Sequence, residues 1–184
     1  MKKNDGKNTN EKRKRIVVLL GIILVVLGIF VTKNMKNNIS NKDNTSNEET
    51  NLIIDEVNMD ELTKSGLPII IDFGSDSCIP CKEMAPVLEK MNKEMKGRAL
   101  IHFVDVWKNE NAADGFPVEV IPTQVIFDSK GNPFMPSNEL ANKIEFSYYS
   151  LDDTKEHNFT IHKGGLTEEE MSLILKEMGV NSDK

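Results

Sequence analysis

Cysteine is scarce in this 184-residue sequence, which contains only two, Cys78 and Cys81. Two cysteines three positions apart cannot staple a small secreted scaffold, because such scaffolds need several bridges between distant segments. A zinc site made of four cysteines is also excluded within one chain. Zinc would need a second subunit or ligands from the three histidines, which are His102, His157 and His162. The two cysteines are therefore expected to act together.

Positive charge is rare outside the first part of the chain. Of 23 basic and 29 acidic residues, residues 1–36 hold nine basic and two acidic ones, which leaves 14 basic and 27 acidic residues from position 37 onward. This acidic remainder repels phosphate backbones, so we expect no binding of nucleic acid.

Long apolar runs are absent except near the N-terminus, where residues 16–31 read IVVLLGIILVVLGIFV. Four basic residues precede this run, and they predict a single-pass anchor at 16–32 with residues 1–15 in the cytoplasm and the rest of the chain outside the cell membrane. As a helix the run rises about 24 to 26 Å, and flanking Lys and Arg side chains can make up the difference from a hydrocarbon core of about 30 Å.

A cleaved signal peptide is the alternative interpretation of this run. No small-x-small cleavage site follows it, since the next residues are Thr32, Lys33 and Asn34, and this favours an uncleaved anchor. No cysteine follows it either, so a lipoprotein anchor is unsupported. Residues 33–51 are rich in Asn, Lys, Ser, Thr and Glu, and they predict a flexible linker to a folded domain at 52–180.

The domain alternates short apolar runs with helical periods, which predicts an α/β layer fold. We expect helices at 59–65, after Cys81, and from a capping box formed by Thr167 and Glu170. The methionines of the second helix belong to its core stripe, and Pro86 predicts a kink there. The sequence predicts loop at 132–143, and it predicts strands over six segments: 52–57, 67–73, 98–106, 123–128, and a hairpin of 144–150 with 158–163.

Residues 72–81, DFGSDSCIPC, run from a predicted strand through a loop into a helix. A helix that begins at Cys78 points free N–H groups and its positive dipole end at the sulfur, which lowers the thiol pKa and stabilises the thiolate. The thiolate can attack a partner disulfide, and Cys81, one turn further on, can then displace the partner. Pro80 suits a first helical turn, where its missing N–H has no intrahelical partner.

The sequence resembles the thioredoxin family in an ordered set of residues. Asp72 stands six residues before Cys78, and the pair Ala85-Pro86 follows the cysteine motif. Ile121-Pro122-Thr123 then precedes a strand. The resemblance covers residues 52–131 and 164–179, and it implies a thioredoxin-like fold, with a central mixed sheet flanked by helices and an insertion at about 132–157 before the last strand.

The resemblance implies a role for each matching residue. Cys78 would be the nucleophile, Cys81 the resolving thiol, and Asp72 a buried carboxylate that relays the proton of Cys81. Burial suits Asp72 to this role because it raises a carboxyl pKa toward neutrality. Pro122 would be a cis-proline that faces the disulfide, and Ile121 would present its backbone to an extended substrate. The residues expected at the substrate-binding surface are Ile121, Pro122, Ile79 and Pro80.

Several positions depart from the family pattern. Ser77 replaces the usual tryptophan before the first cysteine, and Gly74 replaces an aromatic residue. Ile79 replaces a glycine, and inner-motif residues tune the redox potential. By alignment, the lysine that often pairs with the buried aspartate falls at Ile101, so Asp72 would ionise less readily than its counterparts.

The expected activity is reduction of disulfides in exported proteins, without a metal and without any cofactor beyond the redox-active Cys78–Cys81 disulfide. The family implies protein thiols and disulfides as partners, a monomeric state, and a polytopic membrane thiol reductase of the CcdA or DsbD kind as electron donor. Apocytochrome c is one candidate target. A disulfide oxidase or isomerase of the same fold is the alternative, although oxidants of this superfamily usually carry histidine inside the motif.

Other interpretations remain open at this point. The fold could act as a binding module, which would need no Asp72, and half a metal site could explain the cysteines. Asp72 could be a polar strand end, and Pro122 an ordinary loop proline. Trp107 and the three histidines are expected to be structural or surface residues. Tyr148 and Tyr149 fit hairpin packing better than a substrate flap.

Overall fold

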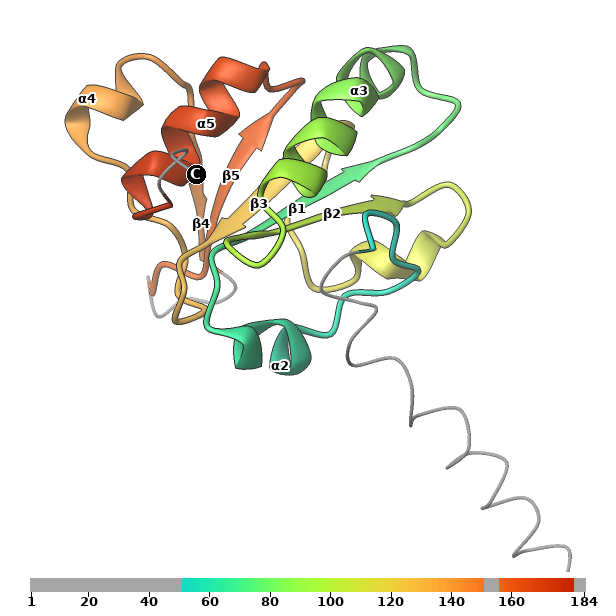
Figure 1. Cartoon of the computed structure of the whole chain (residues 1–184). Helices are drawn as coiled ribbons and strands as arrows, with labels where there is room; N and C mark the ends of the chain where they lie inside the picture. The colour runs from blue at the N-terminus through green and yellow to red at the C-terminus, as the bar shows by residue number, and fades with distance from the viewer. Residues whose placement is uncertain (1–50, 151–155, 181–184) are drawn as a thin grey trace, which may run out of the picture. The chain divides into compact units, whose positions relative to one another are not determined.

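A mixed five-stranded sheet forms the centre of the computed structural model, which describes residues 51–150 and 156–180 (Figure 1). The strand order is β2-β1-β3-β5-β4, with β1 and β2 parallel and every other neighbouring pair antiparallel. The strands are β1 (Ile69–Gly74), β2 (Leu100–Asp105), β3 (Thr123–Phe127), β4 (Ser147–Tyr149) and β5 (Phe159–Lys163). The predicted mixed sheet and α/β class are confirmed.

Strand β1, which lies between β2 and β3 in the sheet, is buried along its whole length. Its run of three isoleucines suits a strand that is covered on both faces, because each successive side chain finds an apolar layer. Ile69, Ile71 and Phe73 point to one layer of the core, and Ile70 points to the other. Asp72 lies on the same face as Ile70, since side chains alternate along a strand.

One face of the sheet is covered by α3 (Ile79–Glu94) and α5 (Glu168–Glu177), with α4 (Asn138–Ala141) beside them (Figure 1). The expected stripe of α3 is buried against this face through Met84, Leu88 and Met91. Pro86 lies inside α3, and the kink that it implies stays a prediction. The capping box of Thr167 and Glu170 is present at the start of α5, as predicted.

The other face of the sheet is covered by short helical turns. These are α2 (Met59–Leu62), the 3-10 helix η2 (Thr63–Ser65) and the 3-10 helix η3 (Glu110–Ala113). Leu62 and Ala112 enter the core on this side, and Phe116 stacks between Phe73 and Phe159. The predicted helix at 59–65 is therefore confirmed as two consecutive turns.

Two predictions about secondary structure are wrong. Residues 52–57 do not form a strand, because only Ile53 bridges to Phe103 at the edge of the sheet. Residues 132–143 are not all loop, because α4 occupies 138–141. This single turn is held by a residue far away in the sequence. Glu177 of α5 accepts hydrogen bonds from the backbone N–H and the hydroxyl of Ser137, the N-cap of α4.

The predicted hairpin is confirmed, with β4 and β5 paired antiparallel. β5 also pairs with β3 and lies inside the sheet, so it belongs to the core architecture although the resemblance to the family left it out. β4 forms the outer edge. Tyr149 of this strand lies beneath the ammonium group of Lys163, 5.4 Å from nitrogen to ring centroid, which supports its predicted role in hairpin packing.

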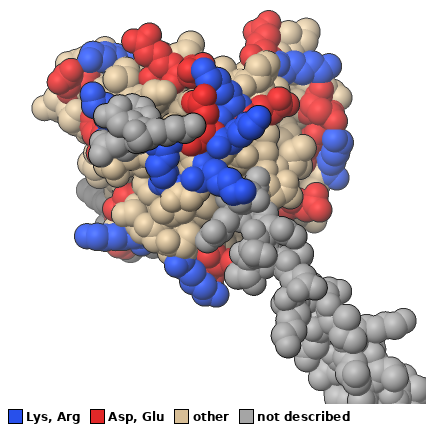
Figure 2. All heavy atoms as spheres, viewed as in Figure 1, with Lys and Arg blue, Asp and Glu red and all other residues tan. Residues whose placement is uncertain are grey.

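The predicted N-terminal segments at 1–15, 16–32 and most of 33–51 lie outside the described residues. Within residues 51–150 and 156–180, no helix is both long and apolar enough to cross a bilayer. Acidic and basic side chains are interspersed with neutral surface on the face of the molecule seen in Figure 2.

Candidate active site

The two cysteines form a disulfide at the N-terminal end of α3. Cys78 is the N-cap residue, its Cα lies 5.3 Å from that of Cys81, and its sulfur accepts the backbone N–H of Cys81 at 3.4 Å. Cys78 is 8% exposed and Cys81 is 3% exposed, so the first sulfur is nearer to solvent. Pro80 lies in the first turn of the helix, as the sequence predicts.

The loop that carries Ile121 and Pro122 faces this disulfide. The Ile121–Pro122 peptide bond is cis, which confirms the expected geometry. The carbonyl oxygen of Ile121 lies 3.9 Å from the sulfur of Cys78. The carbonyl oxygen of Pro122 accepts the backbone N–H of Gly164 at 2.9 Å, which joins this loop to the end of β5. The structure thus brings Cys78, Cys81, Ile121 and Pro122 together.

A salt bridge also joins this loop to β5. The ammonium group of Lys163 lies 2.6 Å from the carboxylate of Glu119, two residues before Ile121. Lys163 also lies over the ring of Tyr149, so β4 and β5 both brace the loop. This arrangement could not be predicted from sequence patterns, because the three residues come from separate segments of the chain.

Asp72 is fully buried beneath the disulfide, in the middle of the sheet. One carboxylate oxygen accepts a hydrogen bond from the side-chain amide of Gln124 at 2.6 Å, and the other has no hydrogen-bond partner. Loss of hydration on burial raises the pKa of Asp72 from 3.8 to about 7, and the hydrogen bond from Gln124 opposes this shift. The Asp72 carboxyl is therefore suited to accept and return protons near neutral pH.

Gly74 separates Asp72 from Cys81. A Cβ atom at this position would lie 3.2 Å from the sulfur of Cys81 and 3.5 Å from the unpartnered oxygen of Asp72, and only 2.8 Å from the ring of Phe103. The glycine therefore lets Phe103 fill the space beside both groups. Sequence reasoning noted Gly74 but missed Phe103, because the contact depends on how β1 and β2 pair.

The placement of the missing lysine at Ile101 is wrong. Ile101 pairs with Ile70, whereas the residue of β2 opposite Asp72 is Phe103. The two positions differ by two residues, and the apolar alternation of this strand is compatible with either of them. Phe103 is an aromatic residue, so the conclusion that no lysine of β2 lies opposite Asp72 is unchanged.

Replacing Gly74 by alanine is expected to lower the free energy of unfolding by about 1 to 3 kcal/mol, because the new methyl group overpacks against Phe103 and Cys81. Chemical denaturation at neutral pH measures this. Gly165→Ala is the matched control, since its Cβ would meet only the Cβ of Met84 at 3.9 Å. Combining Gly74→Ala with Phe103→Leu should cost less than the sum of the two single changes, and strict additivity would contradict the contact.

The remaining residues considered for chemistry lie away from the cysteines or have structural partners. The ring of His102 is buried and forms a hydrogen bond with the carbonyl oxygen of Asn51. The ring of His157 forms a hydrogen bond with the carbonyl oxygen of Phe159. His162 bonds the backbone of Glu145. No cluster of three metal-ligating side chains occurs in the part of the chain that the structure describes.

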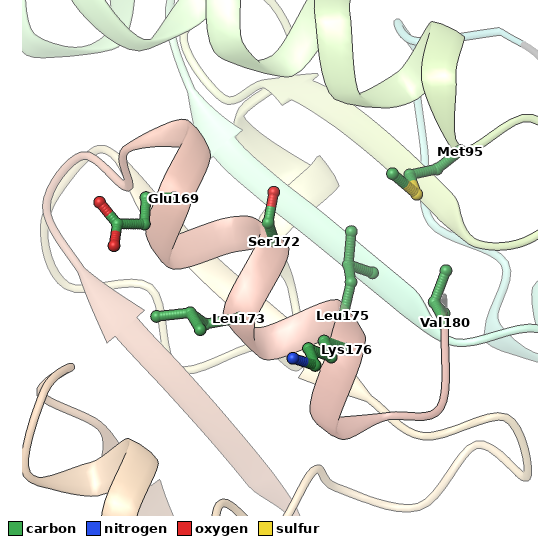
Figure 3. A pocket seen from close by; sticks show the side chains of 7 residues that line it. All are labelled: Met95, Glu169, Ser172, Leu173, Leu175, Lys176 and Val180. Carbon is green, nitrogen blue, oxygen red and sulfur yellow. The ribbon is translucent and has the colours of Figure 1, made fainter. Parts of the chain in front are cut away.

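A shallow pocket of about 140 Å³ lies between the C-terminal end of α3 and α5 (Figure 3). Met95, Leu175 and Val180 line its apolar part, and Glu169 and Lys176 come from the same helix α5. It is at the opposite end of α3 from the cysteines. Nothing in its lining connects it with the disulfide.

Comparison with known proteins identifies the family to which this geometry belongs. The Thioredoxin family model matches residues 49–145. The thioredoxin of Staphylococcus saprophyticus is 37% identical over 98 residues, which span 50% of this chain and 92% of that protein. The thioredoxin of Rickettsia felis is 31% identical over 67 residues, which span 36% of this chain and 64% of that protein.

A solved structure of chloroplastic thioredoxin z is also similar, with 19% identity and a TM-score of 0.45 over 71% of this chain and 98% of that one. That superposition adds nothing to the family assignment. The matched region of the family model contains both cysteines, Asp72 and the cis-proline loop. Residues 146–180, which include β4, β5 and α5, lie beyond it.

Proposed function

This chain belongs to the thioredoxin family, and from that premise we propose that it reduces disulfide bonds of exported proteins through the dithiol of Cys78 and Cys81. Thioredoxins are protein-disulfide oxidoreductases, and the paired cysteines of this chain are consistent with that activity. The observation that carries the proposal is the position of the pair, at a helix N-terminus, beside a cis-proline and above a buried carboxyl group.

The reaction begins with the reduced pair. The thiolate of Cys78 attacks one sulfur of the substrate disulfide, a new S–S bond joins the two proteins, and the other substrate sulfur leaves as a thiolate that takes up a proton. Cys81 then gives its proton to Asp72 and attacks the sulfur of Cys78. The intramolecular disulfide forms, the S–S bond to the substrate breaks, and the second substrate sulfur leaves as a thiolate that takes up a proton, so that two electrons have passed to the substrate.

Asp72 fits the second step because of its place and its pKa. The carboxylate oxygen of Asp72 that has no hydrogen-bond partner and the sulfur of Cys81 lie 3.5 Å and 3.2 Å from the position that a Cβ atom on Gly74 would occupy. A carboxyl group with a pKa of about 7 is partly ionised at neutral pH, so it can accept the proton of Cys81 and later return it. A pure binding module has no use for such a group, which favours an enzyme.

We assign the direction of electron flow as reduction. The two residues between the cysteines are Ile79 and Pro80, so the histidine typical of strong oxidants is lacking. Outside the cytoplasm a reductant needs electrons from across the membrane, and a polytopic thiol reductase of the CcdA or DsbD kind is the proposed donor. The apolar run at 16–31, preceded by four basic residues, supports an anchor with the catalytic domain on the outer side.

Thiol labelling in intact bacterial cells tests location and direction together. A membrane-impermeant maleimide is expected to label the wild-type chain without added reductant, because the dithiol is external and kept reduced. The Cys78→Ser/Cys81→Ser double variant is the control and should stay unlabelled. Labelling that needs prior reduction would show an oxidase, and labelling that needs cell lysis would place the domain inside.

A further inference from the structure

Trp107 is the single tryptophan of the chain, and its side chain is 61% exposed in the turn after β2. A lone exposed apolar residue needs no explanation by itself. The position of Trp107 needs one, because its backbone is held against the loop that leads into Cys78. β1 and β2 are paired along their whole length, so they end side by side at this edge of the sheet (Figure 1).

The connection runs through the carboxylate of Asp105. One of its oxygens accepts the backbone N–H groups of Trp107 at 3.0 Å and of Lys108 at 3.1 Å. The other oxygen accepts the backbone N–H of Asp76 at 3.1 Å, two residues before Cys78. Asp105 is 8% exposed, so this is a largely buried clamp. The tryptophan turn and the active-site loop are therefore joined at one carboxylate.

Further contacts join the turn after β2 to the active-site loop. The backbone N–H of Val106 donates to the carbonyl of Gly74 at 3.0 Å. The ammonium group of Lys108 forms ion pairs with Asp76 and, at 3.5 Å, with Asp105. Trp107 thus stands on a backbone that is held from several sides.

The active-site loop between β1 and Cys78 offers no large apolar side chain of its own, since its three residues are Ser75, Asp76 and Ser77. Three exposed apolar residues lie next to Cys78, in the cis-proline loop or in the turn after β2. They are Ile79 in α3, Val120 before the cis-proline and Trp107 in the clamped turn. The nearby charges of Asp76 and Lys108 pair with each other. This surface favours an apolar occupant over a charged one.

We propose that Trp107 is a specificity-determining residue, which packs against an extended apolar segment that flanks the reacting cysteine of the substrate protein. The inference rests on the proposed function of Cys78. Large aromatic residues at the centre of contacts between proteins supply much of the binding free energy at low entropic cost. Asp105 acts as a positioning residue, because it touches the loop and the turn and not the substrate.

Steady-state reduction of short disulfide peptides by the full chain tests the proposal. One peptide carries Leu and Val beside the cysteine, and its partner carries Ser at the same places. Trp107→Ala is expected to raise KM for the apolar peptide about tenfold, with kcat nearly kept and a much smaller effect for the serine peptide. Trp107→Phe should fall between, and Met135→Ala, another exposed apolar residue, should equal wild type.

Equal KM values for wild type and Trp107→Ala with the apolar peptide would overturn the proposal and leave the proposed function standing. A wild-type chain that reduces neither peptide would overturn both. The proposal also predicts a direct signal, because Trp107 is the only source of tryptophan fluorescence. In the mixed disulfide of Cys81→Ser with the apolar peptide, its emission should shift to the blue and acrylamide should quench it less. Unchanged emission would count against the contact.

Discussion

Replacing Asp72 by asparagine is expected to stabilise the oxidised protein by about 4 kcal/mol at pH 9 and to change little at pH 4. The carboxyl has a pKa of 3.8 in its ordinary state and about 7 in the folded protein, because burial disfavours the charge. Between these values the folded state holds a proton that the unfolded state has lost, so stability falls as pH rises and levels off above pH 8. Asparagine removes this loss.

Denaturant unfolding of an oxidised soluble chain that begins near Asn51 measures the effect between pH 4 and pH 9. The wild type should lose stability across this range relative to Asp72→Asn. Asp55→Asn removes an exposed carboxyl group and serves as the control for the loss of a surface charge. Parallel profiles for wild type and Asp72→Asn would contradict the raised pKa of Asp72.

The same variant should be a poorer catalyst. Asparagine cannot accept a proton, so the attack of Cys81 on the mixed disulfide loses its base and should slow about a hundredfold at pH 7. Single-turnover kinetics separate this step from the first attack by Cys78. The first step should keep its rate, and an equal loss in both steps would point to damage of the whole site.

Each single cysteine variant is expected to abolish turnover, but the two should differ in what accumulates. Cys81→Ser keeps the nucleophile and lacks the resolving thiol, so the substrate should remain joined to Cys78 and appear as a defined mass increase. Cys78→Ser keeps only Cys81, which is 3% exposed and deeper in the helix, and should trap almost nothing. The two variants are matched controls, because each removes one sulfur and the same intramolecular disulfide.

Equal trapping by both variants would contradict the assigned roles of the two cysteines. Trapping at Cys81 alone would reverse them. Mass spectrometry of the intact adduct decides between these outcomes, and reduction by dithiothreitol confirms that the bond is a disulfide.

The residues of the site that lie within one motif could be predicted from the sequence. Cys78, Cys81 and Asp72 are set by a strand, a loop and a helix that follow one another directly, so local patterns specify where they lie. That Pro122 faces the disulfide could be predicted only from the resemblance to the family, because Pro122 and the cysteines are far apart in the sequence. Propensity alone does not predict a cis peptide bond.

The partners of these residues could not be predicted, because strand pairing decides them. Gln124 reaches Asp72 from β3, and Phe103 reaches it from β2. Asp105 lies within the predicted strand 98–106, and nothing in that pattern indicates that its carboxylate accepts backbone N–H groups of two loops. The failure at 52–57 has the same origin, since a strand forms only where its backbone pairs with a neighbouring strand over several residues, and here only Ile53 bridges to Phe103.

The reduction potential of the Cys78/Cys81 couple tests the central claim most directly. The soluble chain that begins near Asn51 would be equilibrated against defined thiol and disulfide buffers, and the oxidised fraction would be measured by alkylation and mass spectrometry. For a reductant we expect a potential near that of thioredoxin, about −270 mV. A value near about −120 mV, the range of a strong oxidant, would contradict reduction, and a pair that never forms the disulfide would contradict the exchange chemistry itself.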